Sequence, residues 1–417
     1  MINLKLMVVN SYFYKIGYNT LVQICGRIIS IFLGFISVGL LTRYLGEEGF
    51  GNFSLAFAYF SIFGIIGDWG LQTTMVRELA MKKNLSSKIY GTYFWIKIFL
   101  LIFSIFLALF LLLFMPYTKF LKLGIVLALF SGGLGVLNTY GTVIFQANLR
   151  LDLVTLTDLI NKIVTVLFII FFIYLRVGFY GIVCTILLGN FIQSLLIIIL
   201  LKRFVIYNLT FDFDLAKVLF YKSVNIGFLN LLTLLYFKID TLILSIFRNS
   251  EEIGIYSLSY KILENILAFW GYYMASVYPV FSQILERGDI LQKIWKKSFY
   301  LGTFSSIIIF LSGFTFAPLI IKVLGGEAFH GSVIALRILL LGLPLFFVNN
   351  LFFHTLLVKE KSKELLYIIC RSLIFNILFN IVFILKWGYL GAAITTIFTE
   401  LFLTINYAFN FKKLGIF

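Results

Sequence analysis

Long apolar segments fill nearly the whole chain and constrain what it can fold into. Hydrophobic residues make up 61% of the 417 residues, whereas charged residues make up only 12%. Residues 98–115, 163–175 and 195–201 belong to apolar stretches of about 20 residues, the length that a helix needs to cross a bilayer. A soluble protein of this length could not bury so much apolar surface. We therefore expect a polytopic integral membrane protein.

About twelve membrane spans are expected. Helices are favoured over strands because the apolar segments are continuous, whereas the strands of a membrane barrel alternate between lipid-facing and lumen-facing residues. The predicted helices are residues 17–42, 51–74, 90–114, 120–146, 156–176, 180–201, 219–247, 253–281, 299–323, 333–358, 363–385 and 389–411. Pro318 and Pro344 are expected to interrupt the ninth and tenth helices, and Pro279 to close the eighth. The sequence thus predicts an all-α fold without a soluble domain.

The distribution of Lys and Arg predicts the orientation in the membrane. Loops on the side of the N-terminus carry 19 of these residues, and the opposite loops carry 7. By the positive-inside rule, both termini are expected in the cytoplasm. The net charge of +16 is mostly this topology signal, and its scatter over short loops argues against nucleic-acid binding. Three isolated cysteines, Cys25, Cys184 and Cys370, indicate neither a disulfide framework nor a metal site.

Two short motifs recur and predict that the chain consists of two similar halves. Residues 51–56 resemble residues 254–259, which lie 203 positions later, and residues 178–183 resemble residues 388–393, 210 positions later. An even number of helices separates each matched pair, so both copies run in the same direction across the membrane. We expect two six-helix bundles, residues 1–205 and 206–417, related by a pseudo-two-fold axis. The alternative is that glycine-rich turns recur by chance.

Polar residues at bilayer depth indicate the substrate path, because such residues usually face a cavity or a partner. In the first span, steps of three and four place one set of residues on one helical face, namely Asn19, Gln23, Arg27, Ser30, Gly34 and Ser37. The corresponding positions of the seventh span include Lys222, Asn230 and Asp240, although apolar residues interrupt that face. The candidates for lining the substrate cavity are Asn19, Gln23, Arg27, Lys222, Asn230, Lys238 and Lys261.

Three acids, Asp240, Glu264 and Glu400, are the candidates for ion coupling. A carboxylate on the seventh-span face could bind and release a proton during transport. Asp240 could equally be a fixed counter-ion for a basic residue on another helix. Glu264 lies three residues after Lys261, and an ion pair between them that only makes membrane insertion less costly is the alternative.

Other charges have local interpretations. Asp68 is expected to cap its helix or to pair with Arg77, and Asp158 is expected to pair with Lys162 one turn away. Lys97 is one of several deep charges without an evident partner in the sequence. Because basic residues outnumber acids within the spans, the expected cavity is cationic and suits an anionic substrate such as a phosphate or pyrophosphate.

Several short motifs, taken in their order and spacing, resemble the polysaccharide biosynthesis protein family. They are Arg43-Tyr44-Leu45-Gly46, Gly49-Phe50-Gly51, Asp68-Trp69-Gly70-Leu71, Arg77-Glu78, Ile239-Asp240, Gly254-Ile255-Tyr256-Ser257, Tyr260-Lys261-Ile262, Pro279 and Gly391-Ala392-Ala393 with Glu400. The resemblance covers essentially the whole chain. It points to the oligosaccharide flippase branch of the MOP exporter superfamily, which includes Wzx-type flippases.

This resemblance implies a V-shaped pair of bundles around a cationic cavity lined mainly by spans one, two, seven and eight. It implies translocation of a polyprenyl-pyrophosphate-linked oligosaccharide across the bacterial cytoplasmic membrane by alternating access, often coupled to an ion. The cargo would be a precursor of O-antigen, capsule or another exopolysaccharide. Expected partners are this substrate and membrane lipids, with a polysaccharide polymerase and a chain-length regulator as further candidates. No nucleic acid, cofactor or metal is expected.

Two rival functions stay open. A drug or cation exporter, or a flippase for another lipid-linked precursor, would belong to the same superfamily. A membrane-embedded polysaccharide polymerase or ligase is a rival of a different class, but such enzymes usually need a sizeable outer loop. Here the outer loops have only a few residues, and His330 and His354 lack the spacing of a metal site or a catalytic triad.

The predicted orientation can be tested with single cysteines in a background without native cysteines. Cysteines within Arg248–Glu252 or Lys322–His330 should react with an impermeant thiol reagent applied to the outer face of the membrane. Cysteines within Lys82–Lys88 or Lys293–Lys297 should react only after the membrane is permeabilised. Labelling of the second pair in intact membranes would overturn the orientation.

Overall fold

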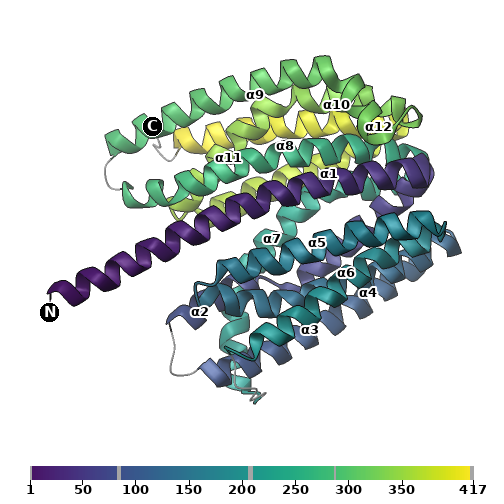
Figure 1. Ribbon diagram of the computed structural model, residues 1–417. Coiled ribbons are helices and arrows are strands. Elements are labelled where there is room, and N and C mark those ends of the chain that lie inside the picture. The colour runs from purple at the N-terminus through teal and green to yellow at the C-terminus, as the bar shows by residue number, and fades with distance from the viewer. Residues whose placement is uncertain (1, 82–85, 205–209, 286–287, 414–417) are drawn as a thin grey trace. The chain divides into compact units, whose positions relative to one another are not determined.

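The described part of the chain consists of helices joined by short turns and loops (Figure 1). This computed structural model describes residues 2–81, 86–204, 210–285 and 288–413, without the side chains of residues 2–20, 80, 81, 86, 87 and 288. The helices are α1 (Ile2–Asp68), α2 (Leu71–Met81), α3 (Ser86–Phe114), α4 (Lys119–Ala147), α5 (Leu151–Tyr174), α6 (Gly178–Leu201), α7 (Phe213–Phe247), α8 (Ser250–Gln283), α9 (Gly288–Gly325), η2 (Ala328–His330), α10 (Gly331–Leu341), α11 (Leu343–Val358) and α12 (Ser362–Lys413). The predicted all-α class is confirmed.

The composition of these helices confirms a membrane protein with several spans. Eight described helices are long and apolar enough to cross a bilayer, or nine if α10 and α11 count as one bent span. Large apolar side chains are exposed on them, among them Phe106 (67%), Phe114 (71%) and Phe304 (67%). Exposure on this scale is expected where a surface faces lipid. The count of twelve spans and the V-shaped arrangement stay predictions.

Glycines break the two longest helices. Gly46 in α1 has φ 67°, and Gly388 in α12 has φ 57°. Only glycine adopts this left-handed region at little cost. Both breaks lie between ranges that the sequence predicts as separate spans. Gly178, the repeat counterpart of Gly388, also has a positive φ of 78°.

Of the three prolines considered in the sequence analysis, only Pro344 lies at a break between helices. Pro344 lies in the first turn of α11, directly after a 46° bend from α10, as predicted. Pro318 does not interrupt α9, which continues to Gly325, so that prediction was wrong. Pro279 likewise lies inside α8, which ends at Gln283. A proline in a helix need not end it where neighbouring groups satisfy the freed backbone carbonyl.

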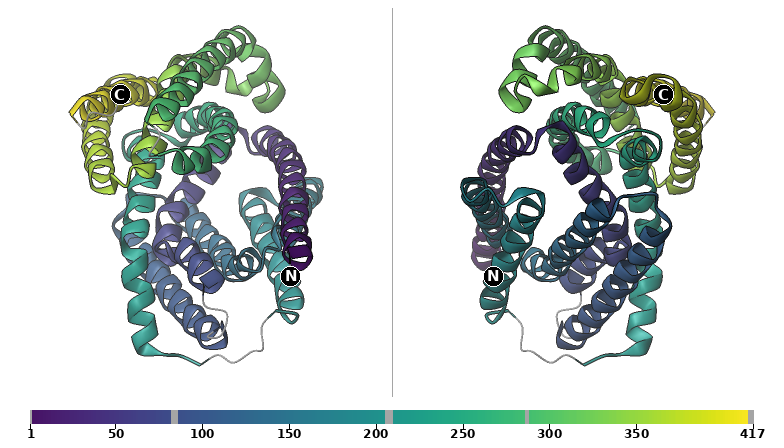
Figure 2. Two further views of the ribbon diagram at one scale, coloured as in Figure 1. Left: turned by 90° about the vertical axis from the view of Figure 1, so that its left-hand side faces the viewer. Right: turned by 90° about the vertical axis from the view of Figure 1, so that its right-hand side faces the viewer.

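The contacts divide the chain into two compact units. Unit 1 comprises residues 1–44 and 56–231, and unit 2 comprises residues 45–55 and 232–417. In unit 1, α6 packs against α4 and α5, while α2 and α3 pack against α4. In unit 2, α10 and α11 each pack against α8, α9 and α12, and Figure 2 shows these helices end-on. The predicted halves, 1–205 and 206–417, stay a prediction.

Two motif glycines that the sequence matched to each other, Gly51 and Gly254, meet inside unit 2. A Cβ on Gly51 would lie 1.8 Å from the Ser250 carbonyl oxygen and 2.9 Å from the Gly254 nitrogen. A Cβ on Gly254 would lie 2.1 Å from the Glu47 carbonyl oxygen. Ser250 Oγ also donates a hydrogen bond of 2.8 Å to Asn52 Oδ1. The backbones of α1 and α8 therefore touch at a point that only glycine permits.

Alanine at Gly254 should destabilise the folded protein. The new methyl group would meet a backbone atom, which cannot rotate away, and overpacking of this kind costs roughly 1–3 kcal/mol. The melting temperature of the purified protein in detergent should fall. Gly271→Ala in the same helix is the matched control, because nothing lies within 4 Å of its Cβ position. Equal stability of the two variants would contradict the close contact.

Candidate functional site

A buried carboxylate, Asp240 of α7, lies at the centre of a hydrogen-bond cluster in unit 2. Its side chain is 2% exposed. Oδ2 accepts hydrogen bonds from the hydroxyls of Tyr256 (2.8 Å) and Thr396 (2.9 Å), and Oδ1 accepts one from Asn380 Nδ2 (2.7 Å). Asn380 Nδ2 also donates to Asn376 Oδ1 at 2.9 Å. Among the residues that the structure describes, these hydrogen-bond partners of the carboxylate are all neutral.

The break at Gly388 is what allows this cluster to form. Asn380 precedes the break and Thr396 follows it, yet both side chains contact Asp240. The two arms of α12 therefore lie side by side at the level of the carboxylate. Tyr256 adds a contact from α8, so that one side chain of α7 links three other helical segments.

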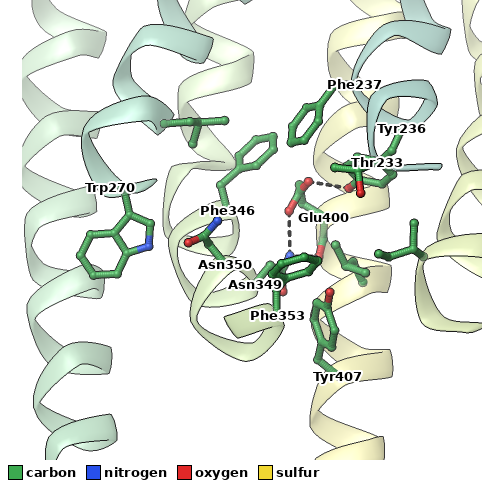
Figure 3. A pocket seen from close by; sticks show the side chains of 13 residues that line it. Thr233, Tyr236, Phe237, Trp270, Phe346, Asn349, Asn350, Phe353, Glu400 and Tyr407 are labelled. Carbon is green, nitrogen blue, oxygen red and sulfur yellow. Dashed lines mark hydrogen bonds between the residues drawn. The ribbon is translucent and has the colours of Figure 1, made fainter. Parts of the chain in front are cut away.

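Glu400 of α12 is the second buried carboxylate of unit 2, also 2% exposed. It accepts hydrogen bonds from Tyr236 Oη at 2.5 Å and from Asn349 Nδ2 at 2.7 Å (Figure 3). It borders a cavity of about 180 Å³. The cavity is lined by Thr233, Tyr236, Phe237, Leu267, Trp270, Phe346, Asn349, Asn350, Phe353, Ile369, Glu400, Leu403 and Tyr407. An acid, amides and aromatic rings thus surround this space, and none of the predicted cavity bases lines it.

The third predicted acid, Glu264 of α8, holds two predicted substrate bases. Lys238 Nζ lies 2.6 Å from Oε1, and Lys261 Nζ lies 3.0 Å from Oε2. Lys238 Nζ also lies 6.0 Å from the centre of the Tyr260 ring. The predicted pairing of Lys261 with Glu264 is therefore present, and Lys238 joins it from α7. We call Lys238, Glu264 and Lys261 the charge triad.

The predicted bases of unit 1 also lie beside acids. Lys222 of α7 forms an ion pair with Glu78 of α2. Arg27 is exposed on α1 and interacts electrostatically with Asp158 of α5. Gln23 is likewise exposed on α1, and Asn230 is exposed on α7. The side chain of Asn19 lies outside the described residues.

Lys97 and Asp68 correct two expectations. Asp68 pairs with Lys97 of α3 at 2.7 Å rather than with Arg77, and Lys97 is only 1% exposed. Asp68 also accepts a 3.3 Å hydrogen bond from the backbone nitrogen of Gln72, so it caps the first turn of the following helix, α2, rather than its own helix. Sequence distance concealed the pair, because the two residues come from helices that only the tertiary fold brings together.

Sequence reasoning missed an amide network that joins α4, α5 and α6 of unit 1. Asn138 Nδ2 donates to Gln193 Oε1 (3.1 Å), and Asn161 Nδ2 donates to Gln193 Oε1 (2.6 Å) and Asn190 Oδ1 (2.8 Å). Gln193 Nε2 donates to Asp158 Oδ1 at 2.9 Å. A signal was available, because residues 158 and 161 of one span and 190 and 193 of the next are polar at helical spacing.

No metal centre is evident in the described chain. Within residues 2–81, 86–204, 210–285 and 288–413, no group of three or more His, Cys, Asp or Glu side chains could hold a metal ion. Cys25, Cys184 and Cys370 are all free.

The comparison with protein families is decisive. The family model described as "Polysaccharide biosynthesis protein" matches residues 16–285, and the MatE family model matches residues 226–382. The chain belongs to the polysaccharide biosynthesis protein family. The predicted resemblance is confirmed.

Individual relatives agree with this membership, and those named below are transporters or flippases by their printed names. The present chain is 24% identical over 401 residues to the Shigella flexneri protein named "Putative O-antigen transporter". The alignment covers 90% of the present chain and 93% of that protein. A multidrug resistance MATE transporter of the MOP superfamily, in an inward-facing conformation, has a TM-score of 0.79 at 15% identity, covering 93% and 94% of the chains. The lipid II flippase MurJ, in an inward closed conformation, has a TM-score of 0.74 at 15% identity, covering 95% and 87%.

Removing the buried base of the Lys97–Asp68 pair should destabilise unit 1. Lys97→Met leaves a carboxylate without its partner, which costs roughly 3–5 kcal/mol for a buried pair. Adding Asp68→Asn should recover much of the lost melting temperature, because no charge is then left unpaired. Lys322→Met, in the exposed pair with Glu327, is the control and should melt like the parent protein. A double variant no more stable than Lys97→Met would contradict this account.

Proposed function

We propose that this protein translocates polyprenyl-pyrophosphate-linked oligosaccharides from the inner to the outer leaflet of the bacterial cytoplasmic membrane. The observation that carries the proposal is the match, over 90% of the chain, to the "Putative O-antigen transporter". The fold shared with MurJ, a flippase by its printed name, supports it. We further propose that both termini lie in the cytoplasm and that transport proceeds by alternating access. A polysaccharide polymerase and a chain-length regulator are the proposed protein partners.

Accessible bases support an anionic substrate. Lys261 is 50% exposed and Lys222 is 46% exposed, although each contacts a carboxylate. Arg27 is exposed on α1. A pyrophosphate carries several acceptor oxygens and can form charge-assisted hydrogen bonds with such groups. We propose that these bases line the path of the pyrophosphate.

The surroundings of Asp240 support a role in ion coupling. Two of its three partners are hydroxyls, which can donate to a carboxylate and can also accept from a carboxylic acid. The cluster can therefore stay hydrogen-bonded in either protonation state. Asn380 Oδ1 is buried beside it and has no hydrogen-bond partner within the described part of the chain, so this oxygen is free to contact a small cation. We propose that Asp240 takes up and releases the coupling ion, with Glu400 as a second acid in the same unit.

One observation favours a second candidate, an exporter of drugs or organic cations. The unit 2 cavity combines Glu400 with the rings of Tyr236, Phe237 and Trp270. An acid surrounded by aromatic rings suits a cation better than an anion. The MatE family match over residues 226–382 includes the three aromatic residues but ends before Glu400.

Deletion of the gene in its source bacterium distinguishes the two functions. The flippase predicts that lipid-linked repeat units accumulate in the inner leaflet and that surface polysaccharide is lost, with both restored by a plasmid copy. The exporter predicts that efflux of a lipophilic cation such as ethidium falls instead. Reduced efflux with normal surface polysaccharide would overturn the proposed function.

Arg27 should be needed for complementation of the deletion strain. Arg27→Ala should abolish it at normal protein levels, whereas Arg27→Lys should keep part of it, because the charge survives without the two-pronged guanidinium geometry. Arg371→Ala is the control, since that guanidinium lies 4.1 Å from the Tyr367 ring of its own helix. Full complementation by Arg27→Ala would show that Arg27 does not contact the substrate during transport.

Asp240→Asn should fold but lose gradient-driven transport. An amide has the shape of the protonated acid, and the Tyr256 and Thr396 hydroxyls can accept from it. Asp240→Leu should lower the amount of folded protein, because it leaves buried polar groups without a partner. Transport in vesicles with imposed proton or sodium gradients would identify the ion. Undiminished transport of Asp240→Asn with an unchanged pH dependence would exclude the coupling role.

A further inference from the structure

The charge triad of unit 2 contains more positive than negative charge. Lys238 and Lys261 contact different oxygens of the one Glu264 carboxylate, at 2.6 and 3.0 Å. An ion pair that served only to neutralise one carboxylate would need only one lysine. The triad instead carries a formal surplus of one positive charge, held at two points on either side of a single anion.

The triad is also open to other molecules, unlike Asp240 and Glu400, the two other candidate acids for ion coupling. The side chains of Lys238 and Glu264 are each 24% exposed, and that of Lys261 is 50% exposed. Asp240 and Glu400, by comparison, are both 2% exposed and have only neutral partners. An anion can therefore reach the lysines of the triad without first opening the core.

We propose that Glu264 is a resident counter-anion, which occupies Lys238 and Lys261 in the empty carrier and yields them to the pyrophosphate of the substrate. This inference rests on the proposed function, and it says how access of the pyrophosphate to the two lysines is regulated. A carboxylate joins the two ammonium groups through one oxygen each. A pyrophosphate presents oxygens on two phosphorus atoms and can join the same two groups with more charge.

This exchange has two physical consequences. Without Glu264, two ammonium groups would stand unpaired at membrane depth in the empty carrier, which is costly. With Glu264, part of the binding energy of the pyrophosphate is spent on displacing the carboxylate. The resident acid therefore weakens binding and speeds release, because it returns to the lysines as the substrate leaves.

The test measures binding of farnesyl pyrophosphate to the full-length protein in nanodiscs of neutral lipid. Glu264→Gln should tighten binding by roughly tenfold, since it removes two competing ion pairs. Single-cycle translocation of the native lipid-linked substrate should slow, because release becomes slower. Lys261→Gln should weaken binding in both the parent and the Glu264→Gln background. Unchanged or weaker binding by a folded Glu264→Gln protein would overturn the proposal.

The controls separate the possible sources of an effect. Glu327→Gln removes the acid of an exposed pair with Lys322 and should leave binding unchanged. Inorganic pyrophosphate and farnesyl alcohol show whether the headgroup or the chain is recognised, and nanodiscs with phosphatidylglycerol show whether any anionic lipid competes. Thermal melting identifies a Glu264→Gln protein that has lost its fold. In that case Glu264→Asp is used instead, and it should tighten binding less than a folded Glu264→Gln protein would.

A further outcome separates this proposal from the proposed function. If the parent protein binds ethidium but no farnesyl pyrophosphate, the proposed function fails rather than the role of Glu264.

Discussion

Hydrogen bonds to Asp240 bring together the helices that form the centre of unit 2. A charged group at membrane depth cannot form hydrogen bonds with bulk water, so other groups of the protein must supply its hydrogen-bond partners. Tyr256, Asn380 and Thr396 do so from α8 and from both arms of α12. The left-handed turn at Gly388 places the two arms together, and Glu400 lies one turn further along the second arm. The hydrogen bonds to Asp240 thus help to position the arm of α12 that carries Glu400, which borders the unit 2 cavity.

The candidate acids Asp240 and Glu400 and the candidate substrate bases have different surroundings. Asp240 and Glu400 are enclosed and receive hydrogen bonds from neutral groups, an arrangement that can tolerate a change of protonation. The bases on α1, α7 and α8 lie nearer the surface beside carboxylates, as Lys222 does with Glu78. The first arrangement suits an ion that is bound and released, and the second suits exchange with a larger anion.

Much of the fold could be predicted from the sequence, and so could the pairing of Lys261 with Glu264 within one helix, whereas the pairing of charges on different helices could not. Continuous apolar segments gave the helical class, and the breaks near Gly46, Gly388 and Pro344 fall between or within predicted spans as expected. The Lys97–Asp68 pair could not be found, because helical periodicity describes neighbours within one helix and says nothing of contacts between helices. Asp240 was identified as a candidate, but its neutral partners Asn380 and Thr396 lie 140 and 156 residues away.

The link between Lys238 and Glu264 also bears on how the protein is made. α8 carries Glu251, Glu252, Lys261 and Glu264, and it is not among the described helices that are apolar enough to cross a bilayer by themselves. Its partner base lies on α7, the helix synthesised immediately before it. Entering the lipid as a helical hairpin would let α7 and α8 neutralise each other during insertion. The same contact would then serve biogenesis first and transport afterwards.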